Sequence, residues 1–171
     1  SACPPLNKKT GRSEISTILG AFYKGTRLTC AWDVQDDCRR TEVQAAFLAL
    51  LCVASALPTG GQLTVERDGD AWNIFAQANL VRADEALWAS LASGIAPKAL
   101  EPADVQFAML PECASTLERR VRFEIADNSL LISFNYDGSV TIDKVFKARQ
   151  LRSPDRPASM HFSCCDANFR A

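Results

Sequence analysis

The sequence predicts an α+β fold, a two-layer sandwich in which helices pack on one mixed or antiparallel sheet. Its 171 residues are about the size of one domain, and a hydrophobic content of 47% supplies a full core. Some segments repeat apolar residues at helical spacing, and others alternate them as strands do. These patterns run in the order helix, strand, helix, hairpin, helix, helix, hairpin. Because helices and strands do not alternate strictly, the order favours an α+β sandwich.

The first two elements are a helix and a strand. The helix is expected over residues 15–22, with Ser13 as its N-cap and Gly25 just beyond its end. Its apolar residues follow i, i+3, i+4, i+7 spacing: Ile15, Ile18, Leu19 and Phe22. Residues 27–32 then place alternate apolar side chains on one face, which predicts a half-buried strand.

A central helix is predicted over residues 41–57. Thr41 and Gln44 have the spacing of a capping box, and the helix is apolar on nearly every side, so it should lie in the middle of the domain. Pro58 ends it, and the glycine pair that follows supplies a turn. Residues 62–67 and 71–76 then form a hairpin, because the Asp-Gly pair between them favours a tight turn.

The second half predicts two helices and a hairpin. A helix over residues 83–91 closes at Gly94. Another begins at Pro102 and continues to Leu117, with Pro111 either kinking it or starting a new turn. A hairpin follows, formed by residues 121–125 and 130–134. We therefore assign residues 1–134 to one domain and leave residues 135–171, an additional strand and an irregular tail, unassigned.

Composition excludes several classes of function. Nineteen Lys and Arg residues balance 20 Asp and Glu residues, which argues against nucleic-acid binding and against a polybasic membrane surface. The longest apolar run, residues 43–57, is too short to span a bilayer. The seven cysteines are an odd number without framework spacing, and the opening residues do not form a signal peptide. A reduced, cytoplasmic protein is expected.

The join between the central helix and the next strand, Leu57-Pro58-Thr59-Gly60-Gly61, resembles the start of the ATP site in histidine kinases. That resemblance places Cys52 where the kinases carry the Asn that holds Mg²⁺, and Ser55 where they carry a Lys. A thiol is a poor ligand for Mg²⁺. The later Asp-x-Gly-x-Gly motif is replaced by residues 75–79, and the lid region, residues 93–104, holds a single glycine. No ATP and no other cofactor is therefore expected.

A longer resemblance covers residues 11–134. It is carried by "GRSEISTILGAFYKGTRLTCAWDV", "TEVQAAFLALLCVASALPTGGQLTV", "ADEALWASLASG" and "VQFAMLPECASTLERRVRFEI". These pieces resemble the C-terminal domain of ChpT-type histidine phosphotransferases. The resemblance implies a mixed sheet and a kinase ATP-domain fold without the ATP site. It also implies a phosphorelay role, receiver domains and a hybrid histidine kinase as partners, and a homodimer formed through an N-terminal helical hairpin.

In that family the hairpin carries the phosphoryl-accepting His, and it would lie before Ser1. The resemblance thus implies phosphoryl transfer through a His absent from this chain, and whether the chain is itself an enzyme stays open. Its one histidine, His161, stands near Cys164 and Cys165, a set that does not suit tetrahedral zinc. No catalytic, cofactor or metal residue is therefore assigned.

The candidate binding surface is a run of arginines, Arg119, Arg120 and Arg122. On a strand, Arg120 and Arg122 share a face, opposite Val121 and Phe123. These two arginines are candidates for docking an acidic receiver surface, and a solvent-facing sheet edge is the alternative. Two other functions stay open beside the phosphorelay: an ATP-dependent kinase-like enzyme, and a scaffold or interaction module without a relay role.

Overall fold

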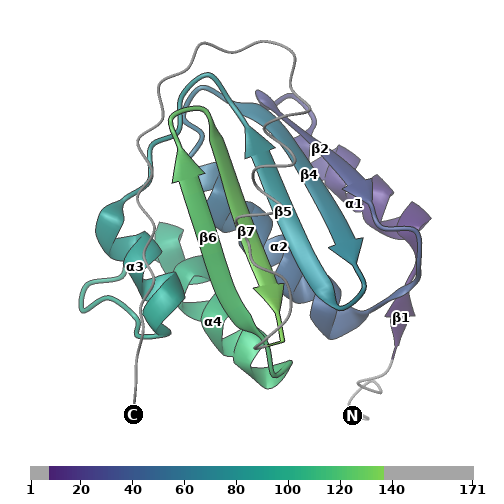
Figure 1. The fold of residues 1–171 in the computed structure, drawn as a ribbon. Helices are drawn as coiled ribbons and strands as arrows, with labels where there is room; N and C mark the ends of the chain where they lie inside the picture. The colour runs from purple at the N-terminus through teal and green to yellow at the C-terminus, as the bar shows by residue number, and fades with distance from the viewer. Residues whose placement is uncertain (1–7, 137–171) are drawn as a thin grey trace.

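A computed structural model describes residues 8–136 of the chain. Four α-helices and one 3-10 helix cover one side of a five-stranded sheet (Figure 1). The helices are α1 (Arg12–Tyr23), α2 (Arg40–Ser55), α3 (Glu85–Ser93), η1 (Pro102–Asp104) and α4 (Val105–Thr116). The strands of the main sheet are β2 (Leu28–Asp33), β4 (Gly61–Asp68), β5 (Ala71–Gln77), β6 (Arg120–Ala126) and β7 (Ser129–Asn135). The predicted two-layer α+β sandwich is confirmed.

The main sheet is mixed, in the order β2-β4-β5-β7-β6. Strands β2 and β4 are parallel, and α2 makes the crossover between them, since parallel neighbours cannot be joined by a tight turn. The remaining pairs are antiparallel, and two of them are the predicted hairpins. We call the side covered by helices the inner face and the opposite side, turned toward the viewer in Figure 1, the outer face.

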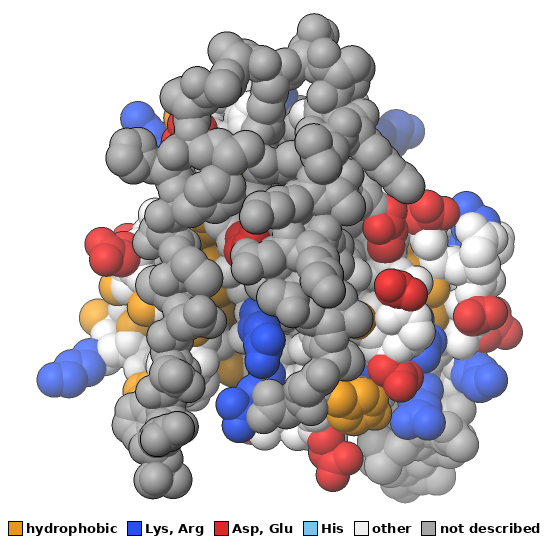
Figure 2. Space-filling model, in the orientation of Figure 1, with side chains coloured by type: hydrophobic (Ala, Val, Ile, Leu, Met, Phe, Trp, Pro, Cys, Tyr) orange, Lys and Arg blue, Asp and Glu red, His pale blue; other side chains and the backbone are white. Residues whose placement is uncertain are grey.

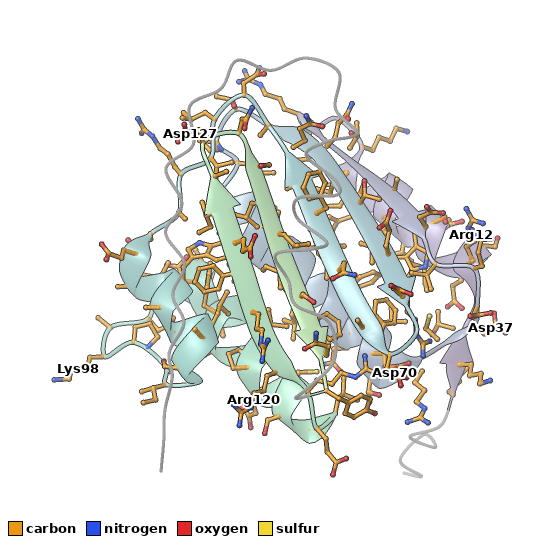
Figure 3. All side chains as sticks on the ribbon, in the orientation of Figure 1. Arg12, Asp37, Asp70, Lys98, Arg120 and Asp127 are labelled. Carbon is orange, nitrogen blue, oxygen red and sulfur yellow. The ribbon has the colours of Figure 1, made fainter. Side chains whose placement is uncertain are left out.

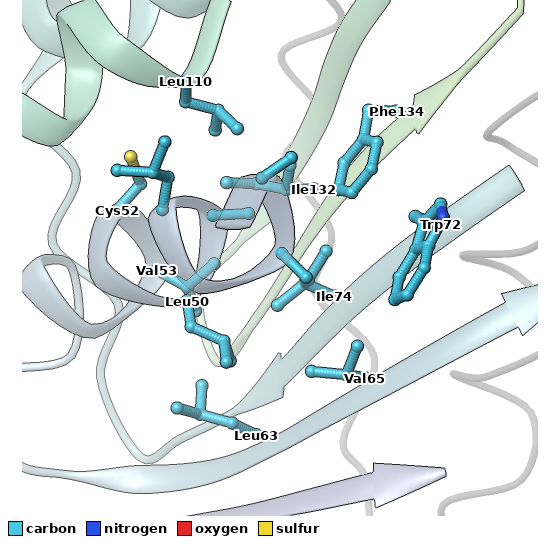
Figure 4. Packing of buried hydrophobic residues seen from close by; sticks show 14 of the residues in the cluster. Leu50, Cys52, Val53, Leu63, Val65, Trp72, Ile74, Leu110, Ile132 and Phe134 are labelled. Carbon is cyan, nitrogen blue, oxygen red and sulfur yellow. The ribbon is translucent and has the colours of Figure 1, made fainter. Parts of the chain in front are cut away.

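Helix α2 lies at the centre of the core. Nine of its 16 residues are buried, and the exposed ones follow a narrow stripe that includes Gln44, Leu51 and Ser55. One side of α2 packs on β5 and β7, and another packs on α4. Figure 4 shows Leu50 and Val53 among side chains of the sheet, with Leu110 of α4 near Cys52 on another side. The nearly unbroken apolar sequence of this helix therefore reflects burial on several sides.

The turn after α2 requires its glycines. Gly60 has a φ of 87°, and a Cβ at this position would lie 2.3 Å from the carbonyl oxygen of Arg27. The Gly61 N–H donates to that same oxygen at 3.1 Å. This close approach of two backbones seats the start of β4 beside β2, so the turn fixes the parallel register of the pair.

Several local predictions are confirmed. The β4–β5 hairpin turns at Gly69, which has a φ of 58°. Gly94 ends α3 in the left-handed conformation and donates its N–H to Ser90 O at 2.9 Å. Pro102 occupies the first turn of η1, as expected of proline at a helix start. Pro111 lies inside α4, which continues through it to Thr116, so the predicted new turn is absent there.

Both predicted N-caps are wrong. Helix α1 starts earlier, with Gly11 as its N-cap, so Ser13 lies within the first turn. Helix α2 has Arg39 as its N-cap, and the Glu42 carboxylate accepts the Arg39 backbone N–H at 3.3 Å. Glu42 therefore takes the capping position that the sequence pattern gave to Gln44. Two further strands, β1 (Lys9–Thr10) and β3 (Cys38–Arg39), pair as a separate small sheet and are too short to show alternation.

Replacing Gly60 with alanine should lower the free energy of unfolding by at least about 2 kcal/mol, because left-handed backbone and a clash with backbone are both penalised. Urea denaturation would measure the change. Gly20 is the matched control, since it lies on the exposed side of α1 with nothing within 4 Å of an added Cβ. Gly20→Ala should be neutral or stabilising by up to about 1 kcal/mol. Equal effects at the two positions would contradict this account of the turn.

Candidate functional site

The end of α2 is the first candidate site, because the sequence places kinase-like positions there. The Cys52 side chain is fully buried, with an exposed fraction of 0%. Burial raises the pKa of the Cys52 thiol, so the uncharged form dominates at neutral pH. Ser55 is exposed, and its hydroxyl donates to Cys52 O at 2.7 Å. Neither residue presents a charged or metal-binding group to an open space.

Helix α4 closes the space beside Cys52. Its buried residues Phe107, Leu110 and Ala114 belong to the same core cluster as Cys52, and Figure 4 places Leu110 near the thiol. Further along the two helices, the Cys113 thiol approaches Thr41 O at 3.9 Å. Beside Cys52, the α2–α4 contact is thus formed by buried apolar side chains. The position that would hold a metal among nucleotide phosphates is part of the core.

The other two kinase-like positions have also changed. Residues Phe75 to Gln77 belong to β5, and Ala78 continues the pairing by donating its N–H to Asn128 O at 2.9 Å. The end of a strand and the first residues after it thus stand where the resemblance to histidine kinases places a glycine-containing motif. The loop after α3 borders a cavity of about 580 Å³ against α4. Its lining is Gly94, Ala96, Phe107, Ala108, Pro111, Glu112, Ser115 and Thr116. The charged member of this lining is a carboxylate, Glu112, which would repel phosphates.

The predicted arginine pair lies on β6, the edge strand of the main sheet. Arg120 and Arg122 are exposed on the outer face, opposite the helix-facing Val121 and Phe123, as the alternation predicted. Figure 3 shows Arg120 at the start of the strand, and Figure 2 shows basic side chains over the same part of β6. These two arginines therefore form a small basic surface at one end of the outer face.

Arg119 does not belong to that surface, which corrects the expectation from the sequence. It is buried, and its guanidinium donates to Glu42 Oε1 at 2.9 Å. Its Cζ atom also lies 5.0 Å from the centre of the Tyr136 ring. Glu118 positions it by adopting a left-handed turn after α4, with a φ of 57°, so that the Arg119 N–H reaches Ala114 O at 2.8 Å. The pair joins the start of α2 to the start of β6.

The Glu42–Arg119 ion pair is the polar feature that sequence reasoning missed. The two residues are 77 positions apart, and both lie among residues whose patterns indicated only a cap and an exposed strand end. Arg67 brings a second guanidinium to 3.9 Å from Glu42 Oε2. Both roles of Glu42, as a cap and as an ion-pair partner, concern the stability of the fold.

Residues 8–136 hold no cluster of three or more His, Cys, Asp or Glu side chains suited to a metal ion. Over the same range no helix has the length and hydropathy needed to cross a membrane. The cysteines at 30, 38, 52 and 113 are free thiols. The predictions about His161, Cys164 and Cys165 and about the tail fall on residues outside the described range.

Comparisons with known proteins identify relatives of this fold. A protein-family model described as the histidine phosphotransferase C-terminal domain matches residues 12–129. A search of curated proteins finds no match. The 1.7 Å structure of a bacterial phosphotransferase aligns with a TM-score of 0.63 and 16% identity. That alignment covers 77% of this chain and 66% of the other, so the chain spans about two thirds of that relative.

Histidine kinases share the fold at lower similarity. The nucleotide-free catalytic domain of the histidine kinase ThkA aligns with a TM-score of 0.53 and 9% identity, over 76% of this chain and 94% of that domain. Full-length ShkA in complex with AMPPNP aligns with a TM-score of 0.50 and 12% identity, over 81% of this chain and 33% of ShkA. At these identities the likeness concerns the fold alone.

Replacing Arg119 with alanine should lower the free energy of unfolding by about 3 kcal/mol, because it leaves a buried carboxylate without its close partner. Urea denaturation of the purified chain would measure this loss. Arg82→Ala is the matched control, since Arg82 is exposed and its printed contact, to Ala56 O, is made by the backbone. The control should change stability by no more than about 0.5 kcal/mol. A loss no larger for Arg119 than for Arg82 would show that the ion pair does not stabilise the domain.

Proposed function

Because this chain belongs to the family of histidine phosphotransferase C-terminal domains, we propose that it serves a phosphorelay as a domain that docks receivers and does not bind ATP. The family places it in two-component signalling. The observation that supports the ATP-free role is the full burial of Cys52 beneath α4. A kinase-like fold is retained, while the position for the metal-binding side chain is filled by core packing.

Phosphoryl transfer in such a relay requires few reacting groups from this domain. A phosphoryl group passes from an aspartate of one receiver to a histidine and then to a second receiver. Catalysis of this transfer is mainly positioning and charge compensation, and the receiver supplies Mg²⁺ and most of the site. The phosphoacceptor histidine is proposed to lie on a helical hairpin before Ser1, which would also form the homodimer. The domain described here would then hold receivers in place.

The basic surface formed by Arg120 and Arg122 is the proposed docking site. Both side chains are exposed on an edge strand, where a partner can approach without displacing a helix. Complementary charge at such a surface increases the rate of encounter and selects partners. The partners proposed are receiver domains of response regulators and of a hybrid histidine kinase, and the compartment proposed is the cytoplasm.

Binding of isolated receiver domains tests the docking proposal. Some members of a panel should bind with measurable affinity by titration calorimetry, and the double variant R120E/R122E should weaken binding about tenfold or more, which is about 1.4 kcal/mol. The double variant R82E/K98E is the control, because it makes the same change of charge at exposed loop residues on either side of α3, outside the strands of the main sheet. Receivers that bind no better than unrelated acidic proteins would support a general interaction module instead.

Titration with Mg·ATP tests the loss of the nucleotide site. No saturable heat or fluorescence change is expected up to millimolar nucleotide, because Cys52 and Ser55 offer no ligand for the metal or phosphates. A nucleotide-binding histidine kinase domain titrated in parallel would verify the assay. Micromolar affinity would favour an ATP-dependent kinase-like enzyme and overturn the proposal.

A further inference from the structure

Strands β2 and β6 are the two edges of the main sheet, and they differ in how they are protected against pairing with another strand. Natural edge strands are commonly protected by charged side chains or by proline. Strand β6 has such protection in Arg120, Arg122 and Glu124. Strand β2 has the sequence Leu-Thr-Cys-Ala-Trp-Asp, without a basic residue or a proline, and its one charge lies at the last position. The edge open to a further strand is therefore β2.

The pairing of β2 with β4 identifies the backbone groups on the free side of β2. Leu28 is the partner of Gly61 in the parallel register, and the Gly61 N–H donates to Arg27 O at 3.1 Å. In a parallel pair, alternate residues of a strand direct both backbone groups to the neighbouring strand. The residues of β2 that direct their N–H and C=O groups to the free side are therefore Leu28, Cys30 and Trp32.

The free side is occupied at Leu28 and open further along the strand. The Leu28 N–H donates to Thr26 Oγ1 at 3.2 Å, and the same hydroxyl lies 3.3 Å from Leu28 O. This contact agrees with the direction assigned to the Leu28 backbone. Among residues 8–136, the backbone groups of Cys30 and Trp32 have no hydrogen-bond partner on this side. Two residues, one position apart on either side of Ala31, thus offer paired donors and acceptors.

We propose that β2 pairs antiparallel with β2 of a second copy of this chain, about a two-fold axis at Ala31. In this register Cys30 of one copy lies opposite Trp32 of the other, and the two residues exchange N–H···O bonds on each side of the axis. Each free donor then meets a free acceptor. The contact is isologous, and it joins the two five-stranded sheets into one continuous sheet.

Other registers leave these groups unpaired. An axis at Cys30 would place Trp32 opposite Leu28, whose free side is already occupied. An axis at Trp32 would place Cys30 opposite Val34, which lies beyond the end of β2. The axis at Ala31 is therefore the register in which the free groups of β2 satisfy one another.

The exposed side chains of β2 also suit pairing with a second copy. Thr29, Ala31 and Asp33 are exposed on the outer face. An axis at Ala31 places Thr29 of one copy opposite Asp33 of the other, so a hydroxyl donor faces a carboxylate acceptor and no like charges lie opposite each other. At the axis, one small alanine side chain faces another. The sequence of this strand is therefore complementary to itself in the same register that its backbone requires.

Sedimentation velocity of the full chain under reducing conditions tests the pairing. An edge contact buries little apolar surface, so dimer should appear only at about 0.1–1 mM chain. The reductant prevents a disulfide between the half-buried Cys30 thiols of two copies. A chain that stays monomeric at about 1 mM would overturn the inference and leave this edge to a strand of another protein.

Two charged variants test the position of the axis. Ala31→Lys and Ala31→Asp each place like charges across the axis, so each should weaken self-association about tenfold or more. An equimolar mixture of the two variants should restore the dimer, because opposite charges then meet. Gln62→Lys is the control, since it adds a charge to an exposed residue of β4, one strand away from the edge, and should leave association unchanged.

The results of these variants separate the outcomes. A dimer that persists in Ala31→Lys would place the contact elsewhere, and a mixture that does not associate would exclude an axis at Ala31, so either result would overturn the inference. Loss of the dimer in both variants and its return in the mixture would establish the pairing. None of these measurements involves a receiver, and Arg120 and Arg122 lie on the opposite edge strand, so the inference does not depend on the proposed function.

Discussion

The need to bury α2 on several sides governs the arrangement of this domain. The helix leaves only a narrow exposed stripe, so the remaining elements must supply apolar surface around it. β5 and β7 supply one side and α4 supplies another. The turn at Gly60 then returns the chain so closely against Arg27 that β4 is seated beside β2. Without that close approach the crossover helix would not be held against the sheet.

The same packing explains how a kinase-like fold can exist without nucleotide chemistry. In a domain that binds a ligand beside its central helix, polar side chains must line a cavity that water or ligand fills. Here Cys52 contributes its thiol to the core, and α4 contributes Leu110 against it. Filling the site with apolar side chains stabilises the fold by burial, at the expense of any ligand. The kinase-like fold is retained because α2 must still be buried against the sheet and α4.

The sheet also has two environments on its outer face. The β2 end is exposed, whereas Leu131 and Ser133 of β7 are buried. The sequence carries a signal for this difference, because Leu130, Leu131 and Ile132 are consecutive apolar residues and a strand buried on one side only would alternate. The exposed Arg120 and Arg122 of β6 lie beside these buried residues on the same face.

Local patterns determined most of the secondary structure and the family. The helical periods, the Asp-Gly and Gly-Gly turns and the C-cap at Gly94 act over a few residues, so their effect appears in the sequence itself. The replaced ligands at Cys52 and Ser55 are likewise visible without coordinates. A hydrophobic pattern in the sequence, however, predicts only that a side chain is buried. It does not indicate which element packs against that side chain.

Tertiary structure alone decided the features that depend on such partners. Glu42 and Arg119 meet across 77 residues, and this contact removed Arg119 from a surface that its neighbours on β6 still form. The closing of the Cys52 position by α4 likewise joins segments far apart in the chain. Long-range contacts arise from the global packing of elements, and a local sequence pattern carries no record of that packing.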